Sequence, residues 1–170
     1  MDRCLWTLQQ ELAAVISGMT PEQMSWHSPG KWCTAEVLEH LYLTYTGTTK
    51  GFQKVLAADR PICSRSTVTQ FAGRLVVFGL KYLPSGRTAP PVSRPRGLPV
   101  ERVLSEIDAK IAEMDQIISQ CEEAFGSSPL LDHPILGPLT AAQWKKFHLI
   151  HGRHHMKQIR LLRRNAVSGR

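Results

Sequence analysis

The sequence predicts an all-α protein, a four-helix bundle with a long crossover between the second and third main helices. Four long segments carry apolar residues at steps of three and four, the period of an amphipathic helix. No segment shows a convincing strand alternation. A stretch over residues 84–99 contains five prolines and separates the second helical segment from the third. A chain of 170 residues can bury a sizeable core, so we expect a single domain over residues 1–170.

The first helix is predicted over residues 2–17, and Gly18 ends it. Its core face is a set of aliphatic residues at helical spacing: Leu5, Leu8, Leu12, Val15 and Ile16. Residues 20–23 (TPEQ) form a capped turn, because a threonine precedes a proline and a glutamine lies three positions later.

The second helix is predicted to begin near Cys33 or Thr34 and to run to about Ala58. Beside its apolar stripe lies a second strip: His40, Thr44, Gly47 and Gly51. Glycine inside a helix lowers helix stability by about 1 kcal/mol relative to alanine, so two glycines on one strip indicate a structural or functional requirement. Two reasons fit equally well: space is kept open beside His40 for a ligand, or the glycines allow close helix packing. Glu36 and Glu39 precede His40, but the pattern assigns neither a catalytic role.

Residues 59–100 break the helical pattern. We expect residues 71–83 to form a short helix or an apolar covering segment, and residues 84–99 to form an extended surface crossover. The third main helix is predicted over residues 100–125, where a narrow apolar seam recurs at helical spacing: Leu104, Ile107, Ile111, Met114, Ile118, Cys121 and Phe125. Gly126 ends it, and residues 132–140 lead into the last helix.

The last helix is predicted over residues 140–164 and has histidines in the middle of its inward face. Its inward residues are Trp144, Phe147, His148, His151, His155, Ile159 and Leu162. His151 and His155 are four positions apart, the spacing that places two imidazoles one turn apart on one face and lets them bind one divalent metal ion. The chain has seven histidines, so such a pair can also arise by chance. A metal site needs a third ligand from a facing helix, and His40 is the best placed.

Three neighbouring side chains are candidates to support these ligands. Gln158 falls beside His155 and can hydrogen-bond a ligand imidazole. His154 lies at the margin of the inward face, where a supporting or a surface role fits better than ligation. His148 points inward and competes with His151 for the role of ligand.

Composition narrows the function classes. The net charge is +7, but much of the excess lies on the outer face of the last helix, without interleaved aromatic residues, so nucleic-acid binding is disfavoured. The four cysteines lack CxxC spacing and fit reduced thiols in a cytoplasmic protein. No apolar run is long enough to cross a bilayer, so we expect no membrane partner.

Two motifs resemble those of the DinB/YfiT-like superfamily of metal-dependent four-helix bundles. Residues 32–41 (WCTAEVLEHL) resemble the start of its second helix, and residues 133–137 (HPILG) with 144–159 resemble its histidine-containing last helix. The middle of the chain carries no motif. The resemblance implies a divalent metal ion (zinc, nickel, iron or manganese) held by His40, His151 and His155. Cys33 departs from the family's Ser or Thr cap, and we expect Thr34 to cap instead.

The resemblance implies a metal-dependent enzyme of hydrolase or low-molecular-weight-thiol S-transferase type. Three histidines leave coordination positions open, where a bound water or thiol loses its proton more easily. The expected partner is a small-molecule substrate, which for an S-transferase would be a thiol. The alternatives are a non-catalytic bundle that binds a partner and, less favoured, a basic nucleic-acid-binding protein. Homodimerisation is compatible with such a bundle, but no residue pattern specifies it.

Overall fold

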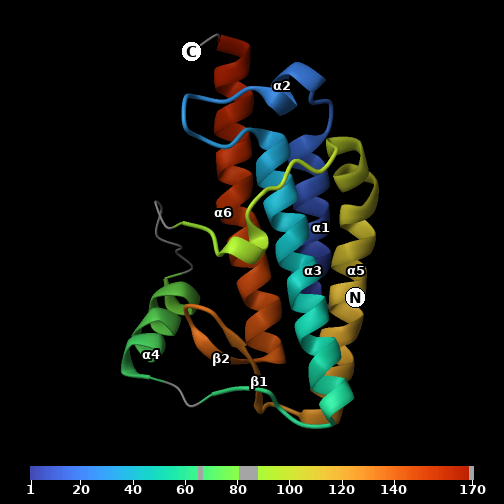
Figure 1. Ribbon diagram of the computed structural model, residues 1–170, viewed down its shortest axis with the longest axis vertical. Coiled ribbons are helices and arrows are strands. Elements are labelled where there is room, and N and C mark those ends of the chain that lie inside the picture. The colour runs from blue at the N-terminus through green and yellow to red at the C-terminus, as the bar shows by residue number, and fades with distance from the viewer. Residues whose placement is uncertain (65–66, 81–87, 169–170) are drawn as a thin grey trace.

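The computed structural model describes residues 1–64, 67–80 and 88–168 and is mostly helical. Four long helices run side by side (Figure 1): α1 (Arg3–Ile16), α3 (Thr34–Ala58), α5 (Val100–Phe125) and α6 (Ala141–Ser168). The short helix α2 (Pro21–Ser25) lies at the end of the bundle where α6 finishes. The predicted all-α class is confirmed, and so is the bundle with a long crossover between its second and third main helices.

The core lies between the four long helices and is built from the predicted apolar stripes. α3 packs mainly on α5, and α1 packs mainly on α6. Fully buried aliphatic and aromatic residues come from each helix and include Leu8, Leu12, Leu41, Tyr45, Phe52, Ile107, Ile111, Met114, Ile118 and Ile159. Removing such side chains from water is the main favourable term in folding, so the bundle is stabilised along its whole length.

Side-chain caps mark the starts of several helices, whereas α5 begins after Pro99 without one. Thr20 and Gln23 form the expected capping box on α2, and Thr140 and Gln143 form another at the start of α6. The cap of α3 is Cys33: its Sγ accepts from the Glu36 amide at 3.5 Å, and the Glu36 carboxylate accepts from the Cys33 amide at 2.8 Å.

The expectation that Thr34 caps α3 is therefore wrong. Cys33 has the extended backbone of an N-cap residue, whereas Thr34 is already the first residue of the helix. A side chain inside the first turn cannot reach back to the free amides as an N-cap side chain does. Thr34 is instead fully buried.

The lead-in to α6 contains a small antiparallel hairpin, which the sequence pattern did not reveal as strands. Its strands are β1 (Pro129–His133) and β2 (Gly137–Thr140). They are too short for an alternation of polar and apolar residues to stand out. His133 braces the turn: its Nδ1 atom accepts from the amides of Ile135 and Leu136, both at 3.1 Å.

The crossover between α3 and α5 is more structured than predicted. It contains α4 (Val68–Arg74), followed by the π-helical turn η1 (Leu75–Gly79). The short helix predicted over residues 71–83 therefore starts earlier, at Val68. Residues 81–83 lie outside the described residues. The predicted extended segment 84–99 is described from residue 88, contains the 3-10 turn η2 (Pro91–Ser93) and packs on α3. Since Ser93 is buried, the segment is not only a surface connection.

Within the described residues, no helix combines the length and apolar character that crossing a lipid bilayer requires.

Candidate metal centre

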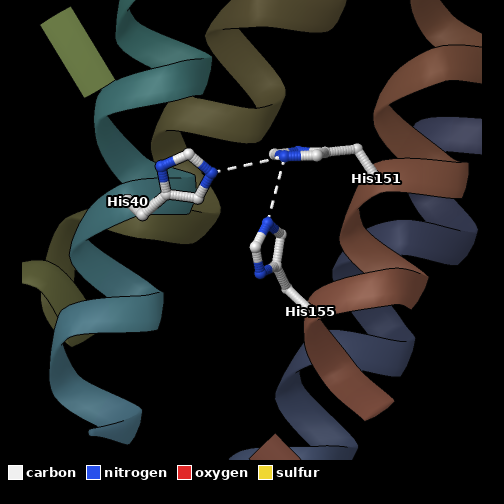
Figure 2. Close-up of side chains that lie close together, drawn as sticks. All are labelled: His40, His151 and His155. Atoms are coloured by element: carbon white, nitrogen blue, oxygen red, sulfur yellow. Dashed lines mark hydrogen bonds between the residues drawn. The ribbon is translucent and has the colours of Figure 1, made fainter. Parts of the chain in front are cut away.

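Three imidazoles from two facing helices meet at one point (Figure 2). The Nε2 atom of His151 lies 3.3 Å from Nε2 of His40 and 3.1 Å from Nε2 of His155. His151 and His155 are one turn apart on α6, and His40 faces them from α3. One ligand atom from each residue lies within 4.8 Å of the others, so the group could hold a metal ion.

Hydrogen bonds on the far side of two rings set the direction of their lone pairs. Nδ1 of His40 lies 2.7 Å from the carbonyl oxygen of Ser93, which can only accept. Nδ1 of His155 lies 2.8 Å from the side-chain oxygen of Gln158. Both rings therefore donate from a protonated Nδ1, and each presents an unprotonated Nε2 to the centre of the group.

This arrangement fits a cation better than it fits three histidines alone. His40 and His155 both direct an Nε2 lone pair towards His151, and the single Nε2 proton of His151 must serve both. A metal ion accepts all three lone pairs at once, and imidazole nitrogen is a common ligand of zinc, nickel, copper and iron. The donor set and its geometry fit a divalent transition metal.

Burial keeps the three rings neutral. Desolvation lowers the pKa of His155 to about 3, with a smaller effect from nearby His40. Desolvation also lowers the pKa of His40, and it lowers that of His151 well below the usual value, with a further contribution from the other two rings. Neutral imidazole is the form that binds metal, so no proton has to leave these rings at neutral pH.

Aromatic side chains form part of the wall around the imidazoles. Trp32 lies with its ring centroid 5.3 Å from that of His40, and Phe147 stacks on His151 with an interplanar angle of 16°. His40 and His155 are only 4% and 7% exposed, so electrostatic interactions within the group are screened less than in water.

The two glycines of α3 serve different purposes. A Cβ atom on Gly51 would lie 2.6 Å from a methyl group of Leu131, so this glycine allows β1 to pack closely on α3. A Cβ atom on Gly47 would meet nothing within 4 Å, and the residue is exposed. Close packing thus explains Gly51, while open space lies beside Gly47 on the strip that also carries His40.

The remaining histidines lie outside the group. His148 is fully buried between Tyr45 and Trp144, with ring centroids at 5.5 and 5.7 Å, and the metal-capable group does not include it. His154 is partly exposed, places its ring edge against His155 and has its Nε2 atom 3.4 Å from Nε2 of Gln158. Of the three supporting candidates, only Gln158 forms a hydrogen bond with a ring of the group, at Nδ1 of His155.

Sequence reasoning missed two contributors, Ser93 and Glu39. The carbonyl of Ser93 orients His40, but a backbone carbonyl leaves no signature in the residue type. Glu39 is 2% exposed and binds the crossover. The sequence features that could have indicated this contact were weak: a carboxylate next to His40 and a segment rich in glycine and proline later in the chain.

The fold and the site define a helical bundle with a three-histidine group that could hold a metal ion. The family model of the DinB superfamily matches residues 5–159, and the chain belongs to this superfamily. The match spans the middle of the chain, for which the sequence motifs offered no support. Neither a curated protein nor a solved structure matches the chain.

Proposed function

We propose that the protein is a metal-dependent enzyme, a hydrolase or a low-molecular-weight-thiol S-transferase, with His40, His151 and His155 as its metal ligands. One observation carries the proposal: three neutral imidazoles direct Nε2 atoms to one point, and no fourth His, Cys, Asp or Glu of the described chain joins them. A closed set of four protein ligands is typical of structural sites, whereas three ligands leave a position for water or substrate.

The side chains of the group have separate tasks. His40, His151 and His155 supply neutral nitrogen ligands, and the Ser93 carbonyl and Gln158 hold two of the rings in the ligating orientation. When bound, a divalent ion such as zinc, nickel, iron or manganese supplies Lewis acidity that lowers the pKa of a water or of a thiol.

The test begins with the metal content of untagged protein and of a His40→Ala variant. We expect about one divalent ion per chain in the wild type and loss of that ion in the variant. Absence of metal in the wild type, even after incubation with zinc, nickel and manganese salts, would contradict the proposal and favour a non-catalytic bundle.

The two reactions are then separated with the loaded protein. Thiol transfer is assayed with a low-molecular-weight thiol and an electrophilic acceptor, and hydrolysis is assayed with ester and amide substrates without thiol. His40→Ala should lack either activity, while His154→Ala, which changes a ring outside the group, should retain it. A turnover that is equal in metal-free and loaded protein would contradict a metal-dependent reaction.

A further inference from the structure

The carboxylate of Glu39 is buried on α3 and is bound by the backbone of the crossover. Its Oε1 atom accepts from the amide of Arg96 at 2.7 Å, and its Oε2 atom accepts from the amides of Gly97 and Leu98 at 3.1 and 3.2 Å. Three consecutive amides can point at one anion because Gly97 has a positive φ of 84°, which turns the backbone into an anion-binding concavity.

No ion pair of the described residues involves Glu39, and the side chain of Arg96 donates to the carbonyl of Val92 instead. The three backbone amides are thus the partners that compensate the buried charge. A buried carboxylate held by amides in this way is a strong and directional contact, since hydrogen bonds to an ionised acceptor are roughly twice as strong as neutral ones. Glu39 therefore fixes residues 96–98 of the crossover on α3.

The next residue of α3 binds the same crossover a few positions earlier. His40 donates from Nδ1 to the carbonyl of Ser93, and Ser93 is buried in the turn η2. Neighbouring residues of one helix thus hold the crossover at two points, Ser93 and residues 96–98. Because the segment between them is short, the carbonyl of Ser93 cannot move far from His40 while Glu39 remains bound.

We propose that Glu39 is a positioning residue for the metal centre: its carboxylate anchors residues 96–98, the anchored crossover holds the Ser93 carbonyl against His40, and His40 is thereby kept with its Nε2 lone pair towards His151. This inference rests on the proposed metal function and adds to it. It gives the crossover a role, namely to set the tautomer and ring direction of one ligand from outside the group.

Two variants break the anchor from opposite sides. Glu39→Gln replaces one acceptor oxygen by an NH2 group that faces backbone donors. Gly97→Ala leaves every charge in place and meets no atom within 4 Å, but it disfavours the positive φ that directs the amides. Glu36→Gln is the matched control, because Glu36 lies one turn away on α3 and its carboxylate accepts from the amide of Cys33 at the start of the helix.

The first readout is the affinity for Zn²⁺, measured by competition with a chelator. We expect roughly 10-fold to 100-fold weaker binding in Glu39→Gln and in Gly97→Ala, the usual range for loss of a partner of a metal ligand, and unchanged binding in Glu36→Gln. Weakening by Gly97→Ala also shows that the effect does not come from the charge of Glu39 acting on the ion. Wild-type affinity in both anchor variants would overturn the inference and leave the proposed function intact.

The second readout needs no metal. In ¹⁵N-resolved NMR of the metal-free protein, His40 should show a single Nδ1-protonated tautomer with a hydrogen-bonded Nδ1 proton, and this signal should be lost or averaged in the two anchor variants only. If the wild type binds no metal, the proposed function fails, but the tautomer still decides the positioning role. An unchanged His40 tautomer in folded Gly97→Ala would overturn the inference, even if Glu39→Gln fails to fold.

Discussion

The Nδ1 atom of His40 and the carbonyl oxygen of Ser93 lie 2.7 Å apart, although 53 positions separate them in the chain. The contact joins a helix of the bundle to the long crossover. It leaves His40 one nitrogen with which to face the two histidines of α6. A segment that looks like a spacer in the sequence therefore takes part in orienting the candidate metal centre.

Single substitutions on α6 should separate metal ligands from bystanders. His151→Ala and His155→Ala should each abolish tight metal binding, because each removes one of three convergent Nε2 atoms. His154→Ala is the control, since its ring lies outside the group. Elemental analysis after dialysis checks the outcome, and one ion per chain retained in His155→Ala would refute the ligand assignment.

Gln158→Ala should weaken metal affinity without abolishing binding. Its side-chain oxygen is the partner of Nδ1 in His155, and loss of such a partner typically reduces affinity by about 10-fold or more. Gln53→Ala, on the exposed side of α3, serves as a control for the loss of a glutamine. Isothermal titration with Zn²⁺ measures both, and equal affinities in the two variants would argue against a role for Gln158.

Alanine at the two glycines of α3 should have unequal effects on stability. Gly47→Ala should raise the free energy of unfolding by about 1 kcal/mol, since the helix gains propensity and the new methyl group meets no atom. Gly51→Ala gains the same propensity but must displace Leu131, so it should be clearly less stable than Gly47→Ala. Urea denaturation compares them, and equal stabilities would contradict close packing at Gly51.

The metal-free protein should lose stability as the pH falls below neutrality, in part because of His148. Burial lowers the pKa of His148 to about 3, with a smaller effect from His133, whereas the unfolded chain keeps an ordinary pKa near 6.5. Between these values the unfolded state binds a proton that the folded state does not. Protonation of His148 in the unfolded chain therefore lowers the free energy of unfolding progressively as the pH falls below about 6.5. Above that pH this loss of stability is absent.

His148→Phe removes this titration while keeping an aromatic ring in the core. We expect its unfolding temperature in chelator to fall less between pH 7 and pH 5 than that of the wild type. His27→Asn, at an exposed loop histidine, should keep the wild-type dependence. Parallel pH dependences in His148→Phe and the wild type would show that His148 does not contribute.

Metal removal should lower the unfolding temperature without unfolding the bundle. The core of apolar residues extends along all four long helices and does not depend on the three histidines. Restoring metal at 100 times its Kd should add about 2.7 kcal/mol to the free energy of unfolding. Circular dichroism with and without chelator measures this, and a loss of helicity on chelation would instead indicate a structural metal site.

Local patterns were enough to place the main helices and to nominate the three histidines. The residues that face the core of α5 and α6 repeat at helical spacing, and capping residues mark the starts of α2 and α6. Spacing along one helix also placed His151 and His155 on one face. These features depend on neighbours within a turn or two, so they can be read without knowing the rest of the fold.

The contacts that orient the site could be identified only from the tertiary structure. The Ser93 carbonyl, the amides around Glu39 and the methyl group above Gly51 come from segments distant in sequence. Backbone donors and acceptors are the same in every residue apart from proline, so residue type does not reveal which of them meets a given side chain. Periodicity determined which faces are buried, whereas the path of the crossover over α3 determined which atoms meet there.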